Sequence, residues 1–423
     1  MRVAAMSLSA LLIAGYSAGS SLCFADVTSQ NQASMNARFQ VSGEGLPFEA
    51  VQYRNFEDYI VQTRERLKRH KVYLDPSRIM PDLDASTPFE RSPAGHCKPV
   101  ANGRPGRGIL LLHGLSDTPL AMTDLADAFA QRCFLVRVLL LPGHGTRAGD
   151  LLDVHRNDWR NATRFGLETL KRDADTVFVG GFSLGGLLSV HAVLEGAELE
   201  GAFIFSPALV LADAWLIRQA VWLRHVLAWV DRDSQDDYAR YEAMPMNAMA
   251  ETYLLTRELK QLLETQDVTV PVFMAQSADD PVIDVAANQK YFRKRFTHPS
   301  SRLLMYQRNL QDIEELDPRV RYFNSFLPAQ RIASFSHLSL HIAPTHSHYG
   351  VAGDYRSCGQ GSGERSSDAV SRCLQALRPW YGEVYRDIPV TVPDPEAMAR
   401  LTFNPRFDEM FDQVDDFIAD NSP

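Results

Sequence analysis

The feature that most constrains the fold is a unit that occurs three times between residues 104 and 194. In each unit, a short apolar run ends in a glycine-containing turn, and a segment with helical spacing of apolar residues follows. Continuous apolar runs are typical of strands that are buried on both faces. Their alternation with helices predicts a mostly parallel sheet with helices on both faces. The predicted strands cover residues 108–112, 134–141, 176–179, 202–205 and 270–275.

The composition is that of a globular protein with a sizeable core. Of the 423 residues, 45% are hydrophobic and 22% are charged, which excludes disorder of the whole chain. The formal net charge is −9, and no run rich in Lys and Arg offers a surface for phosphate backbones. The sequence therefore argues against nucleic acid as a partner.

Residues 1–25 have the pattern of a secretory signal peptide. Arg2 precedes a largely apolar run over residues 3–15, and small residues end the segment. The apolar run is too short to span a membrane, so we expect an exported protein that is periplasmic or secreted. A lipid anchor at Cys23 is the less favoured alternative, because Leu22 is bulky where the lipoprotein pattern has a small residue.

The four cysteines that follow this segment predict two disulfides, as an even number in an exported protein permits. Cys358 and Cys373 bracket a loop rich in Gly and Ser. Cys97 precedes the first predicted parallel strand and Cys133 precedes the next, so both lie near the amino-terminal edge of the sheet. We therefore expect the pairs Cys97–Cys133 and Cys358–Cys373.

A nucleophile motif follows the third predicted strand. Gly181, Ser183 and Gly185 form the pattern G-x-S-x-G between an apolar strand and an apolar helix. This setting is typical of a nucleophile elbow, in which a strained turn pushes the serine hydroxyl out at the carboxyl end of the sheet. Side chains at the two glycine positions would collide with the neighbouring strand and helix.

Two histidine-containing loops follow the first two strands. The loop that contains His113 and Leu115 ends the first strand, so the amide of Leu115 can face the same point as the amide of Leu184. Two such donors would form an oxyanion hole. We interpret His113 as a residue that orders its loop, and His144 as structural or pocket-lining.

Together these segments resemble the α/β-hydrolase superfamily, in particular its carboxylesterase, monoglyceride lipase and lysophospholipase-like branch. The resemblance covers about residues 107–350 and rests on residues 111–115, 141–146, 181–186 and 279–282. It implies an α/β-hydrolase fold, a Ser-Asp-His triad in that chain order and a helical cap inserted after the strand that follows the nucleophile. It also implies that no metal or organic cofactor takes part.

The acid and the base of this triad are Asp280 and His337 in our prediction. Asp280 directly precedes a hydrophobic turn, as the acid does in the resembling family, whereas we expect Asp279 to be solvated. His337 ends a short segment in Ser-His, and an insertion over residues 309–330 separates it from the predicted strand 302–306. His346 is the alternative base and His348 remains open, although a surface role is the simpler expectation for both. We expect His341 to be packed in the interior.

The resemblance divides the chain into five parts. Residues 26–103 form an amino-terminal extension with a helix over 57–72, and residues 351–423 form a carboxyl-terminal extension with the disulfide loop. The core comprises residues 104–207 and 267–350, and residues 208–266 form the helical cap. In the cap, Trp215, Trp222 and Trp229 recur every seven residues, which predicts an aromatic helical face that either packs on the core or lines an apolar substrate channel.

The leading functional hypothesis is an exported serine hydrolase for carboxylic esters of lipids or other apolar acyl groups, with possible membrane contact through the cap. A serine aminopeptidase or an acyltransferase would use the same triad. A non-catalytic binding protein with this fold is the alternative outside catalysis. A metal site built from His341, His346, His348 and Asp354 is disfavoured, because the spacing lacks a known ligand motif.

Overall fold

The computed structural model of the protein describes residues 36–73, 75–98, 100, 103–232, 237–311, 313, 317–359, 366–384 and 392–421. The predicted signal peptide lies outside these residues. An eight-stranded sheet forms the centre, in the order β1-β3-β2-β4-β5-β8-β9-β10. Only β1 is antiparallel to its neighbour. The strands are β1 (Phe89–Arg91), β2 (Arg107–Leu112), β3 (Phe134–Val138), β4 (Thr176–Phe182), β5 (Gly201–Phe205), β8 (Val272–Ser277), β9 (Arg302–Gln307) and β10 (Val320–Asn324).

Helices cover both faces of this sheet, and the alternation of side chains along β2 shows why its strands are apolar throughout. Leu110 and Leu112 enter one core, whereas Ile109 and Leu111 enter the core on the opposite face. All four side chains are fully buried. The first core includes α5 (Arg156–Asp173), α6 (Leu184–Leu194), α9 (Met246–Thr265) and α10 (Val285–Arg295), and the second includes α4 (Thr123–Gln131) and α12 (Phe407–Asp420). The predicted α/β architecture is therefore confirmed.

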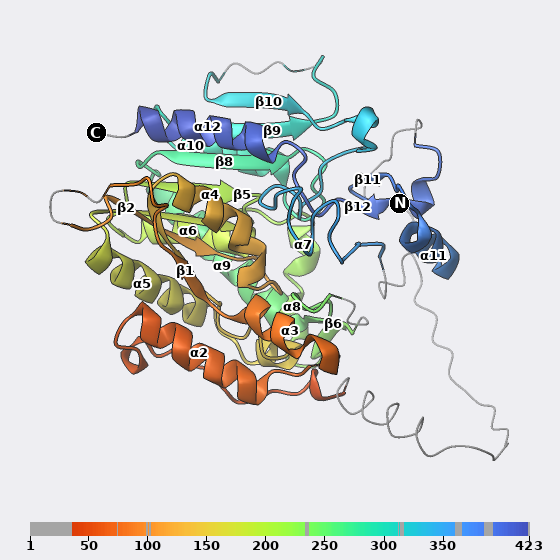
Figure 1. Cartoon of the computed structure of the whole chain (residues 1–423), viewed down its shortest axis with the longest axis horizontal. Helices are drawn as coiled ribbons and strands as arrows, with labels where there is room; N and C mark the ends of the chain where they lie inside the picture. The colour runs from red at the N-terminus through yellow and green to blue at the C-terminus, as the bar shows by residue number, and fades with distance from the viewer. Residues whose placement is uncertain are drawn as a thin grey trace.

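The amino-terminal extension belongs to the same body. Its helices α2 (Phe56–His70) and α3 (Ile79–Ser86) lie together at one side of the molecule (Figure 1), and β1 adds an edge strand to the sheet. The fully buried Tyr59 hydroxyl donates a hydrogen bond to the Leu140 carbonyl and accepts one from the Leu140 amide. This side chain therefore satisfies both backbone groups of a residue in the loop after β3.

The insertion before His337 contains a strand. β10 pairs in parallel with β9 at the edge of the central sheet, so His337 follows the last parallel strand of this sheet. The carboxyl-terminal part contains α11 (Ser367–Gln375) and the two-residue strands β11 (Tyr381–Gly382) and β12 (Ala399–Arg400), which gather at one side of the molecule (Figure 1). The chain then returns to the sheet as α12, whose Phe417 packs edge-on against Phe203 and Phe273.

The segment predicted as the cap has two structurally different parts. Its first part contains α7 (Ala214–Ile217), α8 (Ala220–Leu223), β6 (Trp229–Asp231) and β7 (Met244–Pro245). The expectation of one aromatic helical face is wrong, because Trp229 lies on a strand and contacts Phe39 edge-on, with ring centroids 5.0 Å apart. The second part is α9, which packs on the body of the protein.

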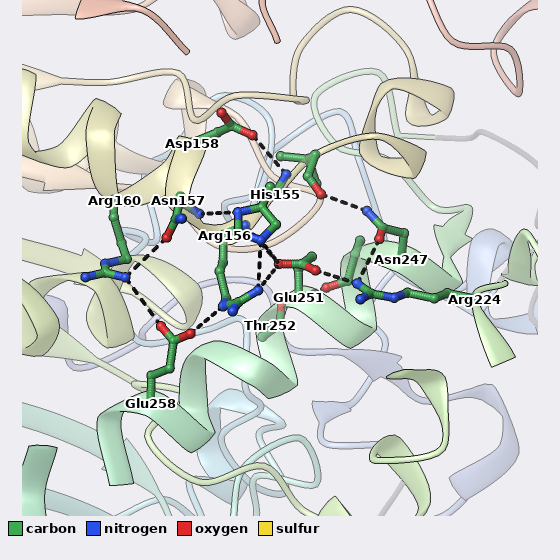
Figure 2. A network of polar contacts seen from close by, with 12 residues as sticks. His155, Arg156, Asn157, Asp158, Arg160, Arg224, Asn247, Glu251, Thr252 and Glu258 are labelled. Atoms are coloured by element: carbon green, nitrogen blue, oxygen red, sulfur yellow. Dashed lines mark hydrogen bonds and ion pairs between the residues drawn. The ribbon is translucent and has the colours of Figure 1, made fainter. Parts of the chain in front are cut away.

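A polar network attaches α9 and the end of α8 to the start of α5 (Figure 2). The buried carboxylate of Glu251 on α9 accepts hydrogen bonds from the Arg156 amide at 3.0 Å and the Arg156 guanidinium at 2.9 Å. It also pairs with Arg224, which follows α8. Asn247 donates to the carbonyls of Leu151 and Val154.

Among the described residues, no helix has the length and apolar character needed to cross a bilayer.

Candidate active site

The turn between β4 and α6 holds Ser183 in a strained conformation. Its backbone has φ 52° and ψ −110°, and a non-glycine residue adopts such angles only when the surrounding structure imposes them. A Cβ at position 185 would lie 2.0 Å from the Leu112 carbonyl oxygen, and one at position 181 would lie 2.5 Å from the Gly185 backbone. The two glycines are therefore required by contact with backbone atoms, which cannot move aside.

The structure brings together the three side chains that the sequence predicts as a triad. Nε2 of His337 lies 3.0 Å from Oγ of Ser183, and Nδ1 of His337 lies 2.6 Å from Oδ2 of Asp280. All three residues are buried, and Asp280 is fully enclosed. They come from distant segments, since His337 is separated by 57 residues from Asp280 and by 154 from Ser183. In this arrangement, Nδ1 donates to the carboxylate and Nε2 is left to accept the serine proton.

The two neighbouring aspartates after β8 have different environments. Oδ1 of Asp280 accepts hydrogen bonds from the amides of Val282 at 2.8 Å and Ile283 at 3.3 Å, which directs the other carboxylate oxygen toward His337. Asp279 forms an ion pair with Arg308 at 2.8 Å and is 7% exposed. The expectation that Asp279 is solvated is therefore wrong, because Arg308 from the segment after β9 covers it.

Backbone amides are available near Ser183 for a developing negative charge. Leu184 is the first residue of α6, where helical geometry leaves the amide without an intrahelical acceptor. The Ser183 amide donates to the Phe205 carbonyl, so it belongs to the sheet. The loop after β2 carries Leu115, followed by Ser116 with φ 65°. These positions fit an oxyanion hole formed by the amides of Leu115 and Leu184.

Two buried histidines brace the loop that carries Leu115. Nε2 of His113 accepts a hydrogen bond from the Leu141 amide at 3.0 Å, and Nδ1 contacts the Gly114 carbonyl. Nε2 of His144 accepts from the Ser116 amide at 3.0 Å, and its Nδ1 contacts the carbonyls of Leu141 and Pro142. Burial lowers the pKa of His113 well below its ordinary value and that of His144 to about 4. Both rings are therefore neutral and act in loop positioning.

The other histidines of this region, His341, His346 and His348, make contacts elsewhere. His341 is buried and stacks on Phe182, with ring centroids 3.9 Å apart. His346 is also buried and its Nδ1 accepts hydrogen bonds from the amides of His348 and Tyr349. The expected surface role for His346 and His348 is therefore wrong.

His348 belongs to a separate buried network that the sequence did not indicate. Its Nε2 lies 2.9 Å from Oδ1 of Asp237, and its Nδ1 contacts Asp354. Tyr349 donates its hydroxyl proton to the other oxygen of Asp237 at 2.8 Å. Burial opposes protonation of His348, but hydrogen bonds to the two carboxylates raise its pKa above the ordinary value. This network ties the first part of the cap to the carboxyl-terminal extension.

The histidines of the disfavoured metal hypothesis do not converge. Among the described residues, the grouping with metal-ligand geometry is His96, Cys97 and Cys133. The two cysteines are bonded to each other, with an S–S distance of 2.06 Å, so their sulfur atoms are not thiolate ligands. The second predicted disulfide, Cys358–Cys373, is also present, with an S–S distance of 1.99 Å.

The first part of the cap exposes an apolar surface to solvent. Trp215 is 71% exposed and Trp222 is 74% exposed, so neither ring packs on the core. The expectation that this face packs on the main domain therefore does not hold for these two residues. Other exposed apolar side chains of the same segment are Leu216, Leu223, Val226, Leu227 and Val230.

A family profile matches the part of the chain that contains Ser183 and Asp280 but ends before His337. Residues 103–308 match the profile of a family described as serine aminopeptidase, S33. A thermostable monoacylglycerol lipase from Bacillus sp. (strain H-257) is 38% identical over 102 residues, which are 24% of this chain and 41% of the lipase. The match thus spans about two fifths of that relative.

Solved structures match about half of the chain. A structure reported for the metagenome-derived lipolytic enzymes LipS and LipT has a TM-score of 0.45 at 21% identity and covers 52% of this chain and 86% of its own. A soluble variant of monoglyceride lipase from Saccharomyces cerevisiae has a TM-score of 0.42 at 17% identity and covers 52% and 81%.

Proposed function

We propose that this chain is a serine hydrolase of the α/β-hydrolase superfamily that cleaves carboxylic esters of lipids or other apolar acyl groups. The observation that carries this proposal is the continuous path of hydrogen bonds from Ser183 through His337 to Asp280. A serine becomes an effective nucleophile when a neutral imidazole accepts its proton and a buried carboxylate holds that imidazole in the required tautomer.

In the proposed reaction, Nε2 of His337 accepts the hydroxyl proton while Oγ of Ser183 attacks the ester carbonyl carbon. The amides of Leu115 and Leu184 stabilise the negative charge that develops on the carbonyl oxygen. The imidazolium, which Asp280 stabilises, then donates its proton to the leaving alcohol as the C–O bond breaks. In the second half, His337 deprotonates a water molecule that attacks the acyl-enzyme, which releases the carboxylic acid and regenerates Ser183.

Two observations favour apolar acyl esters as substrates. The 38% identical segment belongs to a protein named as a monoacylglycerol lipase, and we extend that substrate class to this chain. The first part of the cap also presents Trp215 and Trp222 to solvent. Indole rings favour the boundary between water and lipid, so the proposal includes contact of this surface with a membrane or lipid aggregate.

Peptidase or acyltransferase activity on the same triad is the second candidate within catalysis. The description of the matching family as serine aminopeptidase favours it. A non-catalytic binding protein is the candidate outside catalysis, and covalent labelling by a fluorophosphonate distinguishes it, because only an activated serine reacts. Labelling that is absent in the wild type would favour the binding protein.

The proposal is tested by hydrolysis of p-nitrophenyl esters of graded chain length and of aminoacyl p-nitroanilides. We expect ester turnover in the wild type and a loss of several orders of magnitude in kcat for Ser183→Ala, as removal of a triad nucleophile produces. Faster cleavage of the anilides than of the esters would favour the peptidase. Undiminished ester turnover in Ser183→Ala would exclude the serine mechanism.

Export is part of the proposal. It is supported by the signal-like residues 1–25 and by two disulfides, which persist in oxidising compartments. Expression of the full chain in a bacterium, followed by cell fractionation and amino-terminal sequencing, should yield a periplasmic or secreted protein that starts near residue 26. An unprocessed protein in the cytoplasm contradicts export.

A further inference from the structure

A cationic cavity lies beside the loops of the candidate active site. Its volume is about 310 Å³, and segments of the amino-terminal extension, the loop after β3 and the end of the cap's first part line it. Two acidic residues line it, Asp75 and Asp82. The basic residues that line it are more numerous, although the whole chain carries a net charge of −9, and they are Arg38, Lys71, Arg78, Arg147 and Arg240.

Two of these cations are held side by side by reciprocal backbone contacts. Nζ of Lys71 donates to the Gly145 carbonyl at 3.0 Å and to the Ser86 hydroxyl at 3.0 Å. The guanidinium of Arg147 donates to the His70 carbonyl at 2.7 and 3.2 Å. The Val72 amide donates to the Thr146 carbonyl, which joins the same two segments. The positions of both charges are therefore fixed before a ligand arrives.

Within the described part of the chain, Lys71 and Arg147 donate hydrogen bonds to uncharged carbonyl and hydroxyl oxygens, whereas Arg78 pairs with the Asp354 carboxylate at 2.7 Å. Burial lowers the pKa of Lys71 to about 8, although Asp82 and Asp237 act in the opposite direction. An anion in the cavity would offset the burial of the ammonium.

A second cavity allows the partners of the basic residues around the two cavities to be compared. It has a volume of about 240 Å³, lies between α5 and α6 and is also lined by basic residues. There, Arg160 and Arg164 pair with Glu195, and Lys171 pairs with Glu198 at 3.6 Å. Its cations thus have carboxylate partners within the protein, so basic residues around a cavity do not by themselves indicate an anion site.

The cationic cavity shares its walls with the loop that carries Leu115. The Tyr241 amide donates to the Ser116 carbonyl at 2.7 Å, and Tyr241 lines the cavity. The Ser116 amide donates to His144, two residues before the cavity residue Thr146. Residues at and near the cavity thus contact Ser116, which follows Leu115 in the proposed oxyanion loop.

We propose that this cavity binds a phosphate group through Lys71 and Arg147. Planar guanidinium and compact ammonium groups together are the usual partners of phosphate oxygens. The phosphate can belong to the alcohol portion of an ester substrate, in which case the inference rests on the proposed function, or it can be free inorganic phosphate.

Calorimetric titration of the folded Ser183→Ala protein with inorganic phosphate tests the site without any turnover. We expect saturable binding that is about 10-fold weaker in Lys71→Met, because a hydrogen bond to a charged group is lost. Lys171→Met, in the comparison cavity, should bind phosphate as the parent does. Arg147→Gln provides a second cavity variant should Lys71→Met fail to fold, and it should also weaken binding. Absence of saturable binding, or equal losses in cavity and comparison variants, would overturn the proposal.

Kinetics of the wild-type enzyme then distinguish the two sources of phosphate. A substrate-borne phosphate predicts a lower KM for a lysophospholipid than for the monoacylglycerol with the same acyl chain, and Lys71→Met should remove that difference. Phosphate binding without such a difference in KM assigns the site to free phosphate. Binding to the Ser183→Ala protein that persists when the wild type hydrolyses no ester would reject the proposed function but retain the phosphate site.

Discussion

The strained backbone of Ser183 requires glycine at neighbouring positions of the sequence. The positive φ of Ser183 is imposed by a turn that fits only because Gly181 and Gly185 lack a Cβ. Gly114 makes a comparable contact, since a Cβ there would lie 2.8 Å from the ring of Phe182. These glycines allow β2, β4 and α6 to approach one another closely, which brings the loop of Leu115 near Ser183.

The role of the base is tested by replacing single histidines. We expect His337→Gln to remain folded by circular dichroism and to lose about 10⁴-fold or more in kcat/KM, because the His337 ring is the base that lies within hydrogen-bond distance of Ser183. His346→Gln is the matched control, since its ring bonds to backbone amides of its own turn. Full activity of His337→Gln, together with loss of activity in His346→Gln, would assign the role of the base to His346 instead.

At the scale of elements, one buried carboxylate contributes to the attachment of α9 to α5. Burial alone would raise the pKa of Glu251, but hydrogen bonds from the Arg156 amide and from the Arg224 and Arg156 side chains hold it below its ordinary value. A carboxylate with a lowered folded-state pKa stabilises the fold above its unfolded pKa of about 4.3, and this contribution is lost as pH falls through the folded value.

We therefore expect Glu251→Gln to lower the free energy of unfolding at pH 7 by about 3 kcal/mol, as loss of one partner of a buried ion pair does. Urea unfolding at a series of pH values measures this difference, which should shrink below about pH 4.3 as the wild-type carboxylate becomes protonated. Glu198→Gln, whose side chain is 95% exposed in its pair with Lys171, is the control and should change stability little. A difference for Glu251→Gln that is independent of pH contradicts this account.

We expect the exposed tryptophans of the cap to increase activity on emulsified long-chain esters. Trp222→Ala should leave stability unchanged and reduce activity several-fold on emulsified long-chain esters, with little effect on p-nitrophenyl acetate, because a ring that is 74% exposed contributes little to the core. Trp229→Ala should instead lower stability, since its ring packs on Phe39. Equal effects of Trp222→Ala on soluble and emulsified esters would count against a lipid-contacting cap.

At the scale of the whole molecule, one disulfide ties the amino-terminal extension to the core, and the other closes a loop within the carboxyl-terminal extension. Chain-entropy arguments assign about 4 kcal/mol to Cys97–Cys133, which closes 36 residues, and about 3 kcal/mol to Cys358–Cys373, which closes 15. We expect paired Cys→Ser variants to lose stability in that order in urea unfolding while retaining ester turnover at room temperature. Non-reducing peptide mapping that found four free thiols would contradict both bonds.

Long-range packing also explains which elements the sequence did not predict. β1 has three residues, and its pairing with β3 depends on contacts between segments about 47 residues apart. The packing of α12 also could not be predicted from its apolar residues alone, because it depends on the contacts of Phe417 with Phe203 and Phe273 on the sheet. Likewise, the ion pair between Asp279 and Arg308 joins two loops that separate strands bring together.

The sequence by itself determined the features that depend on neighbours along the chain. Apolar runs with glycine turns specified the parallel strands, because burial on both faces requires continuous apolar residues. The spacing of Gly181, Ser183 and Gly185 specified the strained turn, since sterics there are local.

Only the tertiary structure decided which side chains converge across the sheet. It placed His337 beside Ser183 and Asp280, buried His348 between Asp237 and Asp354, and gathered Lys71 and Arg147 at one cavity. Apart from His348 and Asp354, these residues are distant in sequence, and their contacts follow from strand order and loop packing, which no local pattern encodes.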